Sequence, residues 1–282
     1  MKTKKRKVIF VSLSSIILLI LIAFFISPYS TALLKSKSHF IKHPDNDIVL
    51  FEPGAEEYAD KIAAYLPVAI KRAEQVHGLP FAQDFKIYVC CTQKSFNEYT
   101  AITSPSPFPI RGTALLGDVL IAPSAFNFMG LNTYKETITH ELSHLHFRQR
   151  LGFFKGRKHP VWFSEGFADY VAGSGGEGIE DNDAINFILS GKHFIPEEEG
   201  EIFGSFDSAL NGLSGPMFHK QAKMFVTYII NSDSLKFNLF LRKIQGGESF
   251  SETFNNVMGL KIQDEWFHFL LHLNESFQAI RK

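Results

Sequence analysis

Two stretches decide the fold: TYKETITHELSHLHFRQRL, residues 133–151, and PVWFSEGFAD, residues 160–169. The first is predicted to be a helix, because Thr133 and Glu136 have the spacing of a capping box and the pattern continues to about Leu151. The second begins with a proline, which suits the first turn of a helix. Two consecutive helices are therefore expected.

Five side chains of these helices have the spacing of a catalytic metal site. His140 and His144 stand four positions apart, so both imidazoles project from one helix face and can bind one zinc ion. Glu141 follows the first histidine, where its carboxylate can reach a metal-bound water without being a ligand. Glu165 is the candidate third ligand, and Asp169, four residues later, can accept the free ring N–H of a ligand histidine. The predicted cofactor is Zn²⁺.

The remaining pattern predicts an α+β protein with a small mixed sheet, followed by a mostly helical part. Residues 112–122 are expected to be a hairpin or one bulged strand near a sheet edge, and Pro67 and Gly78 to bend and end the first helix. Expected strands are residues 49–52, 85–90, 112–116 and 118–122, and expected helices are residues 55–77, 133–151, 160–173, 216–230, 234–244, 249–257 and 261–273.

The N-terminus has the pattern of a membrane anchor. Residues 1–7 read MKTKKRK, and the apolar run Val8–Ile26 is long enough to span a bilayer. The basic flank predicts a cytoplasmic N-terminus and an extracytoplasmic remainder. The alternative is a cleaved signal peptide, because Ser30–Ala32 resembles a cleavage site, and the protein would then be secreted.

We accordingly divide the chain into three parts. Residues 1–26 are the cytoplasmic tip and transmembrane anchor, residues 27–45 a stalk, and residues 46–282 one extracytoplasmic domain. Within that domain, residues 46–158 are the α+β part with the first metal helix. Residues 159–282 are the helical part that supplies Glu165.

Charge and cysteine content exclude some classes of protein. Residues 1–44 hold eight basic and no acidic side chains, which leaves 21 basic against 29 acidic beyond them, a net charge of −8. Nucleic acid is therefore not an expected partner. Cys90 and Cys91 are adjacent and cannot form a cross-linking framework. They are expected to be buried thiols, with a strained vicinal disulfide as the alternative.

These motifs resemble the gluzincin metallopeptidases, which carry HExxH on one helix and a glutamate ligand on the next. More narrowly, the pattern of Pro160–Ala168 is similar to that of the peptidase-MA-like domains, and the resemblance covers roughly Ile48–Trp266. It implies a zincin fold in which an edge strand packs on the HExxH helix. It also implies roles that agree with the spacing: ligands His140, His144 and Glu165, general base Glu141, and Asp169 as the acceptor of the free ring N–H of a ligand histidine.

The sequence departs from this pattern at His219, because such domains often have a tyrosine early in the third helix. Thermolysin-like enzymes use a histidine to stabilise the oxyanion, and His219 is predicted to have this role. The alternatives are a solvent-exposed histidine at a helix N-terminus, with Tyr170 or Tyr228 as the oxyanion donor.

The expected activity is hydrolysis of peptide bonds in exported proteins or peptides, with Glu141 as general base. An endopeptidase is favoured, since no GxMEN-like motif for a free amino terminus precedes His140. By resemblance, the strand region 112–122 would hold the substrate. One alternative is a catalytically inactive, membrane-tethered zincin-fold binding module, and another is an adhesion ectodomain in which HExxH is accidental.

Overall fold

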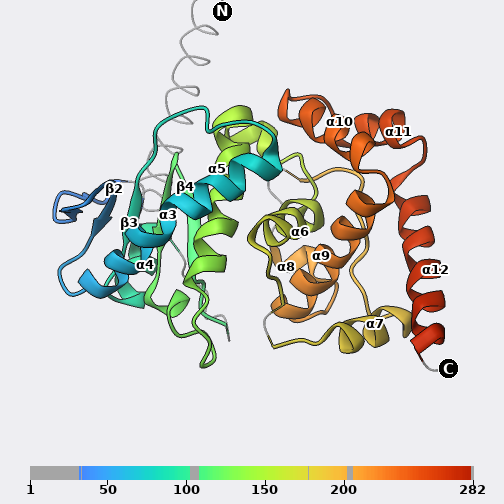
Figure 1. Cartoon of the computed structure of the whole chain (residues 1–282), viewed down its shortest axis with the longest axis horizontal. Coiled ribbons are helices and arrows are strands. Elements are labelled where there is room, and N and C mark those ends of the chain that lie inside the picture. The colour runs from blue at the N-terminus through green and yellow to red at the C-terminus, as the bar shows by residue number, and fades with distance from the viewer. Residues whose placement is uncertain (1–31, 33, 102–107, 177, 202–205, 281–282) are drawn as a thin grey trace, which may run out of the picture.

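The computed structural model describes residues 32, 34–101, 108–176, 178–201 and 206–280. These residues form a small mixed sheet followed by a mostly helical C-terminal part, which confirms the predicted α+β class (Figure 1). The strands are β1 Ile41–His43, β2 Asn46–Phe51, β3 Ile87–Val89, β4 Gly112–Leu115 and β5 Asp118–Ile121.

The sheet is buried on both faces at its centre. Its strand order is β1-β2-β3-β5-β4, with β2, β3 and β5 parallel and the two edge strands antiparallel to their neighbours. Val49, Ile87 and Val119 belong to the main core, whereas Leu120 and Cys90 pack in a smaller cluster. Because successive side chains alternate between faces, strands buried on both sides must be apolar at nearly every position.

Helices cover the two faces of the sheet. Helices α3 (Glu56–His77) and α5 (Tyr134–Gly156) pack on each other and on the strands of the main core. Helix α4 (Gln93–Thr100) contributes Phe96 and Tyr99 to the smaller cluster. Pro67 lies inside α3, and Gly78 ends it in the left-handed conformation, as the sequence predicted for this helix end.

The predicted hairpin is formed at one edge of the sheet. Strands β4 and β5 are joined by Leu116 and Gly117, which both have positive φ, as a two-residue hairpin turn requires. Strand β4 pairs only with β5 in this sheet and packs against α5. An edge strand therefore lies beside the helix that carries HELSH.

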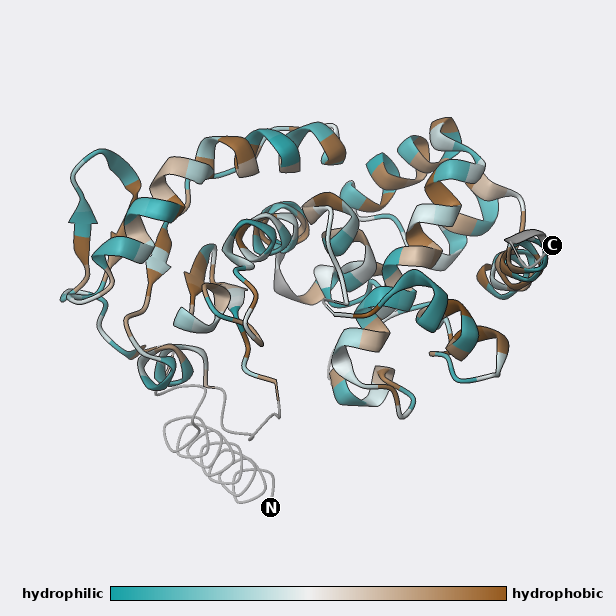
Figure 2. Ribbon diagram, turned by 60° about the horizontal axis from the view of Figure 1, so that its bottom comes forward, coloured by the Kyte–Doolittle hydropathy of each residue, from teal (hydrophilic) through white to brown (hydrophobic). Residues whose placement is uncertain are grey.

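The helical part has an aromatic core. Trp162, Phe163, Phe225, Phe240 and Phe250 are each almost fully buried and contact one another as ring pairs. The helices change between hydrophobic and hydrophilic along their length, as amphipathic helices do (Figure 2). They are α6 Val161–Ala172, α7 Asp181–Leu189, α8 Phe206–Ala209, α9 Gly215–Ser232, α10 Ser234–Gln245, α11 Phe250–Met258 and α12 Ile262–Ile280.

The packed part of the protein begins before Asn46. The sequence pattern had predicted that the folded domain starts at this residue. Strand β1 pairs with β2, and the Phe40 ring is buried against Tyr88 and Tyr99. Part of the expected stalk is thus part of the sheet. A three-residue strand carries no usable periodicity, so the sequence pattern could not indicate it.

The predicted capping box at the start of α5 is not formed. The hydroxyl and the N–H of Thr133 both donate to the Ala125 carbonyl, at 3.1 and 2.9 Å, and Glu136 Oε2 has no hydrogen-bond partner. Ala125 ends the 3₁₀ turn η1 (Pro123–Ala125). A tertiary contact with this turn therefore replaces the local cap.

Among the described residues, no helix is long and apolar enough to cross a bilayer. The run Val8–Ile26, on which the predicted anchor depends, lies outside the described residues.

Candidate metal centre

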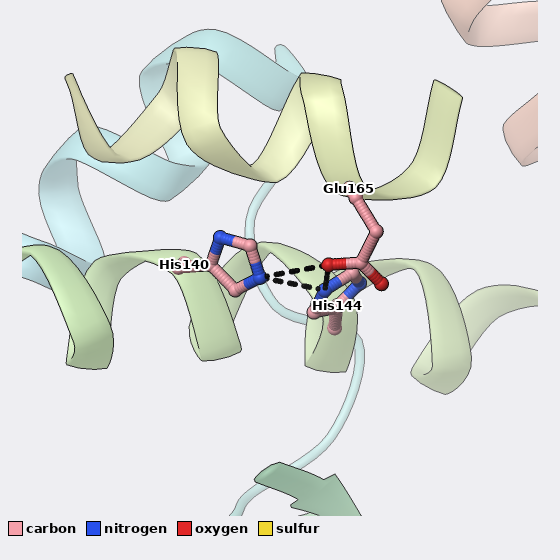
Figure 3. A group of neighbouring side chains, drawn as sticks. All are labelled: His140, His144 and Glu165. Carbon is pink, nitrogen blue, oxygen red and sulfur yellow. Dashed lines mark hydrogen bonds and ion pairs between the residues drawn. The ribbon is translucent and has the colours of Figure 1, made fainter. Parts of the chain in front are cut away.

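Helices α5 and α6 pack together and bring the three predicted ligands to one point (Figure 3). The Nε2 atoms of His140 and His144 are 3.0 Å apart. Glu165 Oε2 lies 3.2 Å from Nε2 of His140 and 3.3 Å from Nε2 of His144. The long sequence gap before Glu165 is bridged by the loop that turns α6 back against α5.

The donor atoms fit a small cation. Ligands about 2.0–2.1 Å from a tetrahedral ion stand roughly 3.3 Å from one another, close to the three separations found here. Moreover, His140 Nδ1 donates to Asp169, so Nε2 of a neutral His140 carries a lone pair that faces the Glu165 carboxylate. That arrangement is repulsive unless a positive charge lies between the two atoms. This group could therefore hold a metal ion.

The electrostatics of the site point the same way. Burial alone would lower the pKa of His140, but the carboxylates of Asp169 and Glu165 raise that pKa well above its ordinary value. Burial would likewise raise the pKa of Glu165, yet the two histidines hold that pKa well below its usual range. Without a metal ion the site binds protons, and a metal cation that binds there must displace them.

Asp169 contacts two histidines from two helices. Its Oδ1 accepts from His140 Nδ1 at 2.8 Å, as the sequence predicted for a second-shell acceptor. Its Oδ2 accepts from His219 Nδ1 at 2.7 Å, a contact that the sequence did not predict. Burial would raise the pKa of Asp169, but His219 and His140 lower it. One ionised carboxylate thus orients both rings.

His219 lies beside the candidate metal site, in the first turns of α9. Its ring centroid is 5.8 Å from that of His140, and 23% of its side chain is exposed. Burial opposes protonation of His219, but Asp169 raises its pKa above the ordinary value. The structure therefore puts His219 where the sequence expected it, with one ring nitrogen held by Asp169.

Glu141 is held by the edge strand. The side chain is buried, and Oε2 accepts a hydrogen bond of 2.8 Å from the backbone N–H of Ala114 in β4. A Cβ on Gly112 would lie 2.9 Å from Cγ of Glu141, so only glycine allows β4 to pass this close to α5. Glu141 is not one of the three converging side chains, which matches its predicted position as a non-ligand.

Gly166 lies against helix α9. A Cβ at this position would meet the Ala222 carbonyl oxygen of α9 at 2.5 Å. Gly166 therefore sets the distance between α6 and α9.

Three further histidines lie apart from the three ligands. His146 is buried with its Nε2 on the Leu79 carbonyl, and His159 lies in an aromatic cluster with Phe147 and Phe163. His268 is exposed on α12, with Nδ1 4.0 Å from Glu265. Of the residues in view, none of these joins a metal-binding group.

The two cysteines are free thiols, so the vicinal disulfide is not formed. Cys90 is fully buried, as expected, whereas Cys91 is half-buried. Burial raises the pKa of the Cys90 thiol.

No family model matches this sequence, and no match was found among curated proteins. The geometry of the site therefore carries the functional argument.

Proposed function

We propose that the protein is a zinc-dependent endopeptidase of the gluzincin kind, with the zincin fold that the peptidase-MA-like resemblance implies. The observation that carries this proposal is the convergence of His140, His144 and Glu165 beside a carboxylate, Glu141, that is not a ligand. Two histidines and one carboxylate are the ligand set of thermolysin-type catalytic zinc sites, which keep a fourth position for water or substrate.

In this proposal the residues divide the work of hydrolysis. A bound zinc ion would supply Lewis-acid activation of water and of the scissile carbonyl. Glu141 takes a proton from the attacking water and passes it to the leaving amine. Asp169 fixes the tautomer and orientation of His140 and turns the ring of His219. His219 then donates to the oxyanion that develops.

The substrate would lie along β4 as an added strand. In the β4–β5 ladder, Thr113 and Leu115 pair by hydrogen bonds with β5, so the backbone groups of Gly112 and Ala114 point outward. The Ala114 N–H meets Glu141 there, which agrees with this alternation. An extended peptide that paired with this edge would pass directly in front of the base.

The proposed location follows from the N-terminal sequence. We propose that residues 8–26 anchor the protein in a membrane and that the peptidase acts outside the cytoplasm on exported proteins or peptides. A C-terminal tag should then be digested by protease added to spheroplasts, and protection of that tag would reverse the topology.

An inactive binding module is the second candidate. It could use the same fold and the same metal. However, a purely structural zinc site does not require a buried carboxylate that is not a ligand, such as that of Glu141. The hydrogen bond between Ala114 and Glu141 holds that carboxylate in position and so favours the enzyme.

The test combines metal content with cleavage by the full-length protein in detergent. We expect one equivalent of zinc and cleavage of a peptide library at internal bonds, read from new termini by mass spectrometry. Bound zinc with an intact library would favour the binding module. Absence of zinc binding at His140, His144 and Glu165 would remove both candidates.

A further inference from the structure

Arg148 extends the line of functional side chains on α5. It stands four residues after His144 and seven after Glu141, so on a helix it lies within about 40° of both. The helix is interrupted only at Gly152, beyond this position. Arg148 therefore belongs to the face that looks onto the candidate metal site.

The charge of Arg148 has no partner of its own. Its side chain is exposed, and among the described residues it forms no hydrogen bond and no ion pair. By contrast Arg150, on the same helix, donates to the Pro80 carbonyl and so joins α5 to the chain after α3. Arg150 has a structural contact, whereas none is seen for Arg148.

The charges around Arg148 agree with this placement. The protein packed around this solvent-exposed side chain lowers the pKa of its guanidinium, the carboxylates of Glu141 and Glu165 raise that pKa, and the like charge of Arg157 lowers it. Arg148 is thus close enough to the metal-site carboxylates to interact with them. A second cation, Arg157, is also near.

A cation in this place does not help a metal site, because it repels the ion. It does create a place for an anion that arrives with the substrate. A guanidinium offers a fixed fork of N–H donors that matches a carboxylate bidentately, and such charge-assisted bonds are strong. Arg148 is exposed, so a substrate can reach it without any rearrangement of existing bonds.

We propose that Arg148 binds a carboxylate of the substrate close to the scissile bond, so that the enzyme selects peptides carrying an acidic group at that subsite. This inference rests on the proposed peptidase function. For the proposed endopeptidase this carboxylate is an Asp or Glu side chain. A free C-terminus has the same chemistry but would make the enzyme a carboxypeptidase, and the test below distinguishes the two sources.

Cleavage specificity gives the first measurement. The full-length protein and its Arg148→Gln variant are compared on one peptide library, with Lys135→Gln as the matched control. Lys135 is an exposed cation of the same helix, nine residues and so half a turn away from His144. Wild type and Lys135→Gln should select acidic residues, or bonds near free C-termini, and Arg148→Gln should lose that selection.

Binding gives a second measurement that does not depend on turnover. In the Glu141→Gln background, fluorescent peptides from the preferred sequence are compared as pairs: internal Glu against Gln, and C-terminal acid against amide. One pair should differ by about 10- to 100-fold in Kd, which identifies the source of the carboxylate. Arg148→Gln should abolish that difference, and Arg148→Lys should keep part of it.

The outcomes separate the two proposals. Cleavage without acidic selection, or selection that survives Arg148→Gln, overturns the role of Arg148 and leaves the peptidase standing. A zinc-loaded wild type that neither cleaves nor binds any peptide overturns both. A uniform loss of kcat on neutral peptides in Arg148→Gln would assign Arg148 to the transition state and overturn the specificity role.

Discussion

Glu141 is oriented by a backbone group of the strand that would also receive the substrate. The Ala114 N–H holds one carboxylate oxygen, and Gly112 leaves the room that the side chain needs. The position of the proposed base, Glu141, is therefore coupled to the position of β4, the strand proposed to bind the substrate. A small movement of β4 should displace the carboxylate that is proposed to take the water proton.

Gly112→Ala tests this coupling at the level of one methyl group. The new Cβ would lie 2.9 Å from Glu141 Cγ and 3.0 Å from Thr137 Cγ2, so the strand or the base must shift. We expect turnover to fall by roughly 10- to 100-fold, because catalysis is sensitive to displacements below 1 Å. Gly156→Ala, where a Cβ meets nothing within 4 Å, is the control. Equal kinetic effects of the two variants would contradict the coupling.

Asp169→Asn should weaken two functions at once. Loss of the carboxylate removes the acceptor for His140 and for His219, so metal affinity should fall by roughly 10- to 100-fold. His219→Ala should instead keep the metal and lower kcat by roughly 10²- to 10³-fold, as expected for one oxyanion donor. Metal titration and steady-state kinetics on both variants check this difference. Unchanged metal affinity in Asp169→Asn would be inconsistent with its role.

Residue spacing predicted the members of the site but not all of its contacts. The intervals between His140 and His144 on one helix, and between Glu165 and Asp169 on the next, are fixed by helix geometry, so these two relations could be derived. The bond from Asp169 to His219 depends on where α9 packs, and no local pattern encodes that. The role inferred for Arg148 was missed for a related reason, since a single arginine at a helix end is ordinary in sequence.

Among the elements, the packing of α6 on α9 decides where Glu165 and His219 lie. These two helices pack directly on each other, and Gly166 sits against the backbone of Ala222. The approach explains how His219 can share Asp169 with His140. It also makes this one glycine a structural requirement of the site.

Gly166→Ala should separate these helices. A Cβ would stand 2.5 Å from the Ala222 carbonyl oxygen, a distance that backbone atoms must relieve by moving. We expect a loss of about 1–3 kcal/mol in the free energy of unfolding, as for an overpacked core, together with weaker metal binding. Gly215→Ala at the start of α9, where a Cβ has open space, should cost far less. Denaturant titration of both variants would expose a wrong assignment if their stabilities matched.

Helices and strands could be predicted where the periodic pattern of apolar residues extends over a long stretch of sequence. The amphipathic helices α3, α9 and α10 and the β4–β5 hairpin follow the sequence pattern closely, whereas α12 continues to Ile280, beyond its predicted end at residue 273. Strand β1 and helices α4 and α7 were not predicted, because each is short and its apolar residues become meaningful only against the sheet or the helical core.

At the scale of the whole molecule, buried neutral histidines tie stability to pH. Burial lowers the pKa of His159 and of His146 to about 4. A folded-state pKa below the unfolded value of about 6.5 contributes stability above that pH, and this stability is lost as the pH falls toward 4. Between pH 6.5 and 4, protonation of each such histidine removes roughly 3 kcal/mol from the free energy of unfolding.

The variant His159→Phe keeps an aromatic ring in the cluster of Phe147, Phe163 and Phe250 and removes the titration. Its unfolding free energy should therefore depend less on pH between 6.5 and 4 than that of the wild type. An identical slope for His159→Phe and the wild type would refute the explanation.

In the proposed mechanism, one metal ion bound by three side chains acts together with a general base that does not bind it. The most direct measurement is zinc content and peptide hydrolysis of Glu141→Gln, side by side with the wild type and with His144→Ala. We predict one equivalent of zinc and no hydrolysis for Glu141→Gln, and loss of both for His144→Ala. Full hydrolysis by Glu141→Gln, or loss of its zinc, would contradict the account.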